Sequence, residues 1–257
     1  MSECRFACTR CGKCCFGWLP LTLEEAIEKA DLFPLAMVLY FSRRGSPSFD
    51  IIARFGLLER LSGKVDCAVL AVPTAYIPPS MPCPALTEDN LCSINSQKPL
   101  RCRTMPFYVL RAEDDQQDML RPRKEWLCDI GNSAPVVYKD GKILDRMDFD
   151  NEVAAMEKQS ESLGAYVAKL LKNDPAMRAL AVAAAAKTIP DHMVVSFSSF
   201  FRYDKRWGIK DFAVRQLPVM MDWMGKVDGG PDMVKYVGYY KAAVEELSWF
   251  AERAKSR

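Results

Sequence analysis

Four cysteines near the N-terminus carry the clearest chemistry in the sequence. Cys8, Cys11 and Cys14 follow a C-x2-C-x2-C spacing, and Cys15 follows directly. Thiolates at this spacing can turn inward from one short loop onto one metal centre, and Gly12 relieves the backbone where the loop must curl. Adjacent side chains such as those of Cys14 and Cys15 usually diverge, which favours ligation of different metals or of two corners of a compact polynuclear site. The segment therefore predicts a metal-binding loop.

The remaining cysteines narrow the kind of site. All ten cysteines lie within the first 128 residues, and after the N-terminal group they stand singly in separate segments. His192 is the single histidine of the chain. Sites that need several imidazoles, including Rieske centres and His-rich zinc sites, are therefore excluded. The sequence predicts ligation by thiolates throughout.

Five separated elements resemble, in their order, the CxxCxxCC family of zinc- or iron-chelating proteins (YkgJ-like). They are Phe6 to Cys15, Leu21-Thr22 with Glu25, Cys83-Pro84-x-Leu86 with Leu91 to Ile94, Pro99-x2-Cys102-Arg103 to Pro106-Phe107, and Cys128-x-Ile130-Gly131. The resemblance spans about residues 6–131, half of the chain. The family is related to the flagellin lysine N-methylases, for which an iron–sulfur cluster is implied.

The resemblance implies a set of eight metal and cofactor ligands. They are Cys8, Cys11, Cys14, Cys15, Cys83, Cys92, Cys102 and Cys128. The sequence departs from the family pattern at Lys98, where an arginine commonly precedes the proline, and in two extra cysteines, Cys4 and Cys67. Cys67 lies in an apolar run and is expected to be buried and not a ligand. Whether Cys4 is a ligand stays open.

Iron–sulfur clusters, zinc sites and disulfide bonds are three possible roles for these cysteines. Iron–sulfur clusters use thiolate ligation throughout, so one or two clusters, most simply 4Fe-4S, are the first expectation, with zinc as the alternative. A disulfide framework is disfavoured, because a chain without an export signal should stay reduced.

The three cysteines Cys4, Cys8 and Cys11 also match the C-x3-C-x2-C loop of radical S-adenosylmethionine enzymes. No βα repeat follows them, so we interpret this match as chance.

Side chains near the cysteines suit such a centre. Six basic residues flank the cysteines, and nearby positive charges lower the pKa of a thiol. Surface solubility explains the presence of these basic residues equally well. They are Arg5, Arg10, Lys13, Lys98, Arg101 and Arg103. Trp126 and Phe107 are expected to shield the metal from water, although packing in the hydrophobic core would explain the same residues. His192 is expected to be structural.

Composition limits the class of protein. The 257 residues are 49% hydrophobic and 26% charged, enough to build one large or two modest cores. A net charge of +2 gives no global basic field, so neither nucleic acid nor a membrane is an expected partner, whereas a redox or protein partner is. Without a long apolar run or an apolar signal core, the expected localisation is cytoplasmic. Walker, G-x-G-x-x-G, G-x-S-x-G and H-E-x-x-H motifs are also missing.

The expected fold is α+β, with a loop-rich cysteine half that contains short strands packed against an α-helical bundle. The expected divisions are a cysteine-rich metal- or cluster-binding region at 1–135, a hairpin connection at 136–150 and a helical region at 151–257. A capping box at Thr22 predicts a helix that runs to Tyr40 with a break at Pro34. Short strands are expected at 105–110 and at 136–144, the latter around an Asp-Gly turn. In the helical region, Pro175 is predicted to begin a helix at 176–187, and Pro231 is predicted to begin the last helix. Pro218 is predicted to interrupt a helix at 209–224.

Three functions remain open from sequence alone. The first is a cytoplasmic iron–sulfur protein that acts in electron transfer or in cluster-dependent chemistry. The second, implied by the resemblance, is a cluster-dependent protein (lysine) N-methyltransferase-like enzyme. The third is a structural zinc-binding interaction module. The sequence leaves open whether the protein is an enzyme at all.

Overall fold

An antiparallel sheet of five strands forms the centre of the molecule. The computed structural model describes residues 3–62, 65–187, 192–227 and 230–255. The strands are β2 (Leu19–Pro20), β3 (Leu35–Arg43), β4 (Leu57–Ser62), β5 (Val65–Ala75) and β8 (His192–Ser196). The order is β2-β5-β3-β8, with β4 paired to β5 as well. Helices pack around this sheet, so the α+β expectation is confirmed.

The helix predicted between Pro20 and Tyr40 is correct only in its first part. Helix α1 (Leu23–Glu28) begins with the expected capping box, in which Thr22 and Glu25 exchange hydrogen bonds. After Pro34 the chain forms β3, whose first five residues are fully buried. A strand that is covered on both faces gives a continuous apolar run, and periodicity cannot separate such a run from a buried helix.

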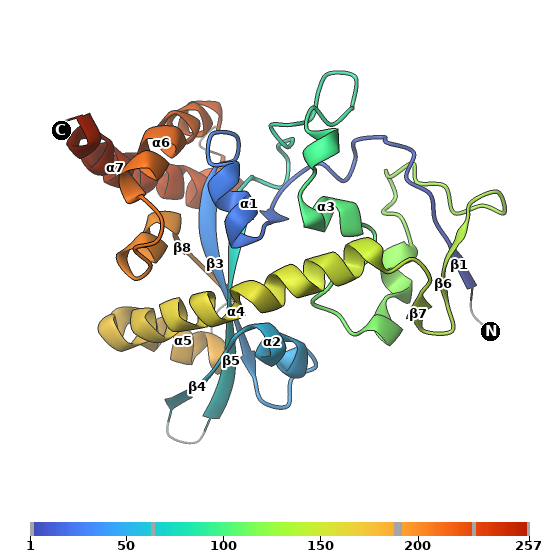
Figure 1. Ribbon diagram of the computed structural model, residues 1–257, viewed down its shortest axis with the longest axis horizontal. Helices are drawn as coiled ribbons and strands as arrows, with labels where there is room; N and C mark the ends of the chain where they lie inside the picture. The colour runs from blue at the N-terminus through green and yellow to red at the C-terminus, as the bar shows by residue number, and fades with distance from the viewer. Residues whose placement is uncertain (1–2, 63–64, 188–191, 228–229, 256–257) are drawn as a thin grey trace.

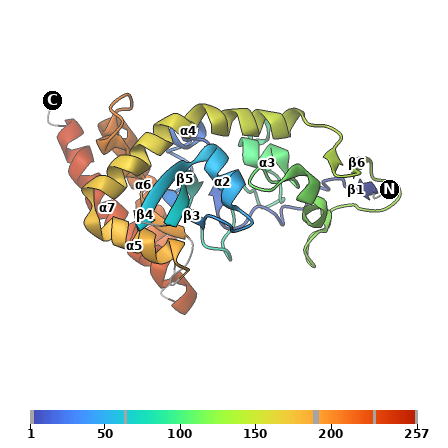
Figure 2. The same ribbon diagram turned by 90° about the horizontal axis from the view of Figure 1, so that it is seen from below.

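Seven helices surround the sheet in the described part of the chain. Besides α1 they are α2 (Phe49–Phe55), α3 (Leu100–Thr104), α4 (Met147–Asn173), α5 (Pro175–Ala185), α6 (Ile209–Lys226) and α7 (Val234–Lys255). Figure 1 shows α4 running across the sheet and on into a lobe that contains α3, β1 and β6, while α6 and α7 lie at the opposite end. Figure 2 shows the same separation from below. No helix among the described residues is both long and apolar enough to cross a membrane.

The lobe around α3 contains the second sheet, formed by β1 (Glu3–Arg5), β6 (Val136–Lys139) and β7 (Lys142–Ile143). The predicted hairpin is confirmed, since Asp140 and Gly141 both have positive φ, as its tight turn requires. The strand predicted at 105–110 is wrong. There the buried side-chain amide of Gln116 accepts a hydrogen bond from the N–H of Tyr108 and donates one to its C=O. These two hydrogen bonds replace those that a partner strand would form.

The helices of the C-terminal half follow the sequence signals with one exception. Asp174 accepts a hydrogen bond from the N–H of Met177 at 2.9 Å, so α5 begins at Pro175 as predicted. Helix α7 follows a short 3-10 turn that starts at Pro231. The expected interruption at Pro218 is wrong, because α6 continues through it.

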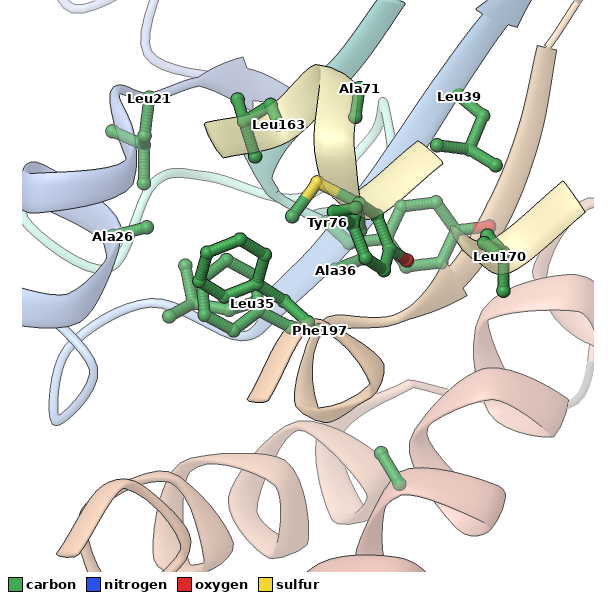
Figure 3. Close-up of a cluster of buried hydrophobic side chains, with 14 of the residues drawn as sticks. Leu21, Ala26, Leu35, Ala36, Leu39, Ala71, Tyr76, Leu163, Leu170 and Phe197 are labelled. Carbon is green, nitrogen blue, oxygen red and sulfur yellow. The ribbon is translucent and has the colours of Figure 1, made fainter. Parts of the chain in front are cut away.

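The two halves of the chain share one sheet and one core. Strand β8 comes from the C-terminal half and pairs with β3 over five residues. The larger hydrophobic core joins Leu21, Ala26 and Leu35 to Leu163 of α4 and to Phe197, which follows β8 (Figure 3). The helical region therefore does not stand apart from the cysteine-rich half as a separate bundle.

Candidate metal centre

The eight predicted ligands line two adjoining cavities. The outer cavity, of about 200 Å³, is lined by Cys8, Cys11, Cys14, Cys15, Cys92 and Cys128. The inner cavity, of about 310 Å³, is lined by Cys14, Cys15, Cys83, Cys92 and Cys102. Thiols from distant parts of the sequence therefore converge on one region of the fold, and three of them border both cavities.

Backbone pairing places Cys8 beside Cys128. Ala7 and Asp129 form an antiparallel bridge, with hydrogen bonds of 2.7 and 3.0 Å between their backbone groups. The hydroxyl of Thr9 donates to the carbonyl of Leu127 at 3.0 Å. The residues between these contacts, Cys8 and Cys128, are therefore held opposite each other across more than a hundred residues of sequence.

The N-terminal loop curls as its spacing predicts. Gly12 has a φ of +71°, and a Cβ at this position would lie 3.1 Å from side-chain atoms of Leu86 and Asn90. The N–H of Cys15 donates to the carbonyl of Gly12 at 3.0 Å, which closes a turn. A glycine is required here, both for the left-handed backbone and for the close approach of the neighbouring loop.

A second set of backbone contacts places Cys15 beside Cys83. Phe16 and Pro82 form an antiparallel bridge, and the N–H of Cys83 donates to the carbonyl of Cys15 at 2.8 Å. The loop then turns back on itself. The N–H of Leu86 donates to the carbonyl of Cys83 at 2.9 Å, and Leu86 pairs with Cys92 in a further bridge. These contacts bring Cys15, Cys83 and Cys92 together.

Cys102 lies on α3, which is anchored from three directions. The carboxylate of Glu25 accepts a hydrogen bond from the N–H of Leu100 at 2.7 Å. Arg101 and Glu152 of α4 form a buried ion pair at 3.3 Å. The hydroxyl of Thr104 donates to a backbone carbonyl of α4. These contacts fix the short helix that carries the last ligand of the inner cavity.

The thiols influence one another electrostatically. A hydrogen bond from the Cys15 thiol lowers the pKa of Cys14 to about 6, and the same interaction raises the pKa of Cys15. Burial raises the pKa of Cys102 to about 12, with additional contributions from the charges of Cys83 and Cys14. Burial also raises the pKa values of Cys83 and Cys128, and neighbouring cysteines add to each effect. Several thiolates in one place repel each other, so a bound cation would favour their ionisation.

The charged residues in both linings are cations. Arg10 and Lys98 line the outer cavity, and Lys98 and Arg101 line the inner one. Among the described residues, neither lining includes a carboxylate or the histidine. A centre that several thiolates bind carries negative charge, which Arg10 and Lys98 would offset, since Arg101 is paired with Glu152.

The donor set decides which metal group fits. In the arrangement of the described residues, no three His, Cys, Asp or Glu side chains are close enough to hold a metal ion. The fit therefore rests on chemistry, since eight sulfur donors surround two cavities bordered by cations. Soft thiolate ligands select iron–sulfur clusters or zinc over hard cations such as magnesium or calcium. Both predicted metal groups fit this donor set.

The two extra cysteines lie outside both linings. Cys4 lies on β1 opposite Tyr138, so the Cys4, Cys8 and Cys11 motif is not gathered around one cavity. Cys67 lies on β5, is fully buried, and has its pKa raised to about 11 by that burial. The prediction that Cys67 is a buried apolar residue is confirmed.

Sequence reasoning placed some of the surrounding aromatic residues incorrectly. Trp126 lines the outer cavity as expected, but Phe107 lines neither cavity and packs against Tyr138 in the smaller core. Trp18 and Tyr108 line the inner cavity and were not predicted. The position of Trp18, three residues after the cysteine loop, was the available signal, whereas Tyr108 depends on the fold of its loop.

The comparison with known families agrees with this geometry. Residues 7–128 match the family model CxxCxxCC, described as a "Putative zinc- or iron-chelating domain". We refer to this segment as the CxxCxxCC domain, after the family model that it matches. The match begins one residue before Cys8 and ends at Cys128, so the CxxCxxCC domain includes all eight predicted ligands. The expected kinship with YkgJ-like proteins and lysine methylases stays a prediction. No curated protein and no solved structure matches the chain.

Proposed function

We propose that the CxxCxxCC domain binds one or two iron–sulfur clusters, most simply 4Fe-4S, and that the protein works in one-electron transfer. The observation that carries the proposal is the convergence of eight thiols from separate segments on two adjoining cavities bordered by cations. Iron–sulfur clusters take thiolate ligands and need no catalytic acid or base for electron transfer.

The chain contributes three properties to such a centre. The thiols bind it, and the backbone bridges at Ala7 and Phe16 orient them. Apolar side chains, among them Trp18, Ile94 and Met105, form much of the inner wall and limit the access of water. Burial and local charge are the means by which a protein sets the potential of a cluster.

Metal analysis tests the proposal. Protein purified without oxygen should be brown and should contain iron together with acid-labile sulfide. Replacement of Cys11 by serine should lower the iron content, whereas Cys67→Ser should leave it unchanged, because the Cys67 side chain is buried on β5. A colourless protein with stoichiometric zinc would overturn the proposal.

Structural zinc is the second candidate, and the family description names it beside iron. Zinc takes four thiolates in a closed tetrahedral site and supplies folding free energy without redox chemistry. Under this alternative the absorption spectrum has no visible band, and a chelator unfolds the domain. Anaerobic preparation is essential to the comparison, since iron lost in air can be replaced by zinc.

A further inference from the structure

We infer that the eight cysteines form two separate centres with four thiolate ligands each. The outer centre would be bound by Cys8, Cys11, Cys14 and Cys128, and the inner centre by Cys15, Cys83, Cys92 and Cys102. The inference deepens the proposed function, on which it depends for the identity of the metal. The division of the ligands holds for either iron or zinc.

Five of the eight thiols border one cavity only. Cys8, Cys11 and Cys128 line the outer cavity, and Cys83 and Cys102 line the inner one. The bridge between Ala7 and Asp129 holds the first and last ligands of the outer centre opposite each other. These five residues therefore define two groups before the shared ones are assigned.

Backbone contacts assign two of the three thiols that border both cavities, and sequence spacing assigns the third. Cys15 is hydrogen-bonded through its carbonyl to the N–H of Cys83, so it belongs with the inner group. Cys92 pairs with Leu86, whose N–H is bonded to the carbonyl of Cys83, so it belongs there as well. Cys14 continues the C-x2-C-x2-C loop of Cys8 and Cys11 and completes the outer group. Each group then has four members, the number that a 4Fe-4S cluster or a structural zinc site requires.

The two centres differ in their exposure to solvent. Cys8 and Cys14 of the outer group are exposed, whereas all four cysteines of the inner group are half-buried. The peptide bond between Cys14 and Cys15 links the groups directly, so the centres are close enough to exchange electrons. The outer centre is then the point of contact with an external redox partner, and the inner centre is the shielded one.

Metal counting on the full-length protein tests the division. The wild-type chain should bind two clusters, about eight iron atoms with an equal amount of sulfide, or two zinc ions if the metal is zinc. Cys11→Ser and Cys102→Ser should each remove half of the metal, and the double variant should remove all of it. A wild-type content of one centre per chain would overturn the inference, and so would retention of half of the metal by the double variant.

The adjacent pair offers the sharpest comparison. Cys14→Ser should remove the same half of the metal as Cys11→Ser, and Cys15→Ser the same half as Cys102→Ser, as judged by the electron paramagnetic resonance signal that survives. Cobalt(II) added to the metal-free variants gives a second readout, since its thiolate-to-metal absorption reports each site without iron. Two cobalt sites in the wild-type protein and one in each single variant, without uptake of iron, would preserve the division and reject the iron–sulfur proposal. Loss of the same electron paramagnetic resonance signal from Cys14→Ser and Cys15→Ser in folded protein, verified by circular dichroism, would reject the division.

Discussion

Lys98 occupies a special position among the residues around the cysteines, because it borders both cavities. No ion pair of Lys98 is present in the part of the chain that the structure describes, and its charge contributes to the lowered pKa of Cys14, after the larger effect of the Cys15 thiol. A half-buried cation beside a thiolate-bound metal centre would stabilise additional negative charge on that centre. The side chain is therefore expected to influence the reduction potential.

Removal of the Lys98 charge should make reduction harder. In Lys98→Gln we expect the reduction potential of the bound metal to fall by tens of millivolts, because the electron is added without the nearby cation. Lys98→Arg is the matched control, since it keeps the positive charge. Potentiometric titration, monitored by absorption spectroscopy, gives the reduction potentials of both variants. An unchanged potential in Lys98→Gln would contradict the electrostatic role.

At the scale of single residues, the sequence singled out the cysteines that line the two cavities better than it did the aromatic residues around them. The spacing of Cys8, Cys11 and Cys14 is local and can be recognised in the sequence, whereas the single cysteines after them were implied by the family resemblance and not by spacing. Phe107 was misplaced because its neighbour Tyr138 comes from another segment, and only the fold brings the two together. Tyr108 could not be predicted, since its position depends on the buried amide of Gln116.

Among the secondary-structure elements, α3 shows most directly how the fold positions a ligand. It has five residues, too few for a helix that is stable on its own. Glu25 connects it to α1, because one carboxylate oxygen accepts from the N–H of Thr22 at 2.9 Å and the other from the N–H of Leu100 at 2.7 Å. A single side chain therefore stabilises the beginnings of two helices, one of which carries Cys102.

Loss of the Glu25 carboxylate should weaken both helix starts. We expect Glu25→Ala to lower the free energy of unfolding by about 2 kcal/mol, since two charge-assisted hydrogen bonds are lost. Urea unfolding measures this change, and metal analysis should show loss from the site that contains Cys102. Glu24→Ala is the matched control, because Glu24 forms an exposed ion pair with Lys158, and such pairs contribute little. Equal destabilisation by the two variants would contradict the role of Glu25.

The elements that could be predicted are those specified by local chemistry. The capping box at Thr22, the turn at Asp140 and the cap at Asp174 each use side chains or dihedral preferences within a few residues. Strand β3 could not be assigned in this way, since its identity depends on pairing with β5 and β8. The central sheet was therefore missed, although the fold class was predicted correctly.

In the whole molecule, the cysteine-rich part and the helical part depend on each other. The N–H of Leu23 donates to the side chain of Gln159 on α4, and Arg101 pairs with Glu152 on the same helix. Strand β8 covers the open edge of β3. Support for α1, α3 and the central sheet thus comes from residues after 146, beyond the end of the CxxCxxCC domain.

A fragment that ends before α4 should therefore fail to maintain the inner centre. Residues 1–135 contain all ten cysteines but lack α4, so α3 would lose both the ion pair of Arg101 with Glu152 and its packing against α4, and a helix of five residues is not stable on its own. We expect this fragment to show no cooperative thermal unfolding and to hold less than half of the metal of the full chain. A longer fragment, 1–187, adds α4 and α5 and should recover part of the metal content, while still lacking β8. Circular dichroism on heating and metal analysis on both fragments measure the difference. Cooperative unfolding of 1–135 with full metal content would show that the cysteine-rich part folds alone, against the shared core seen here.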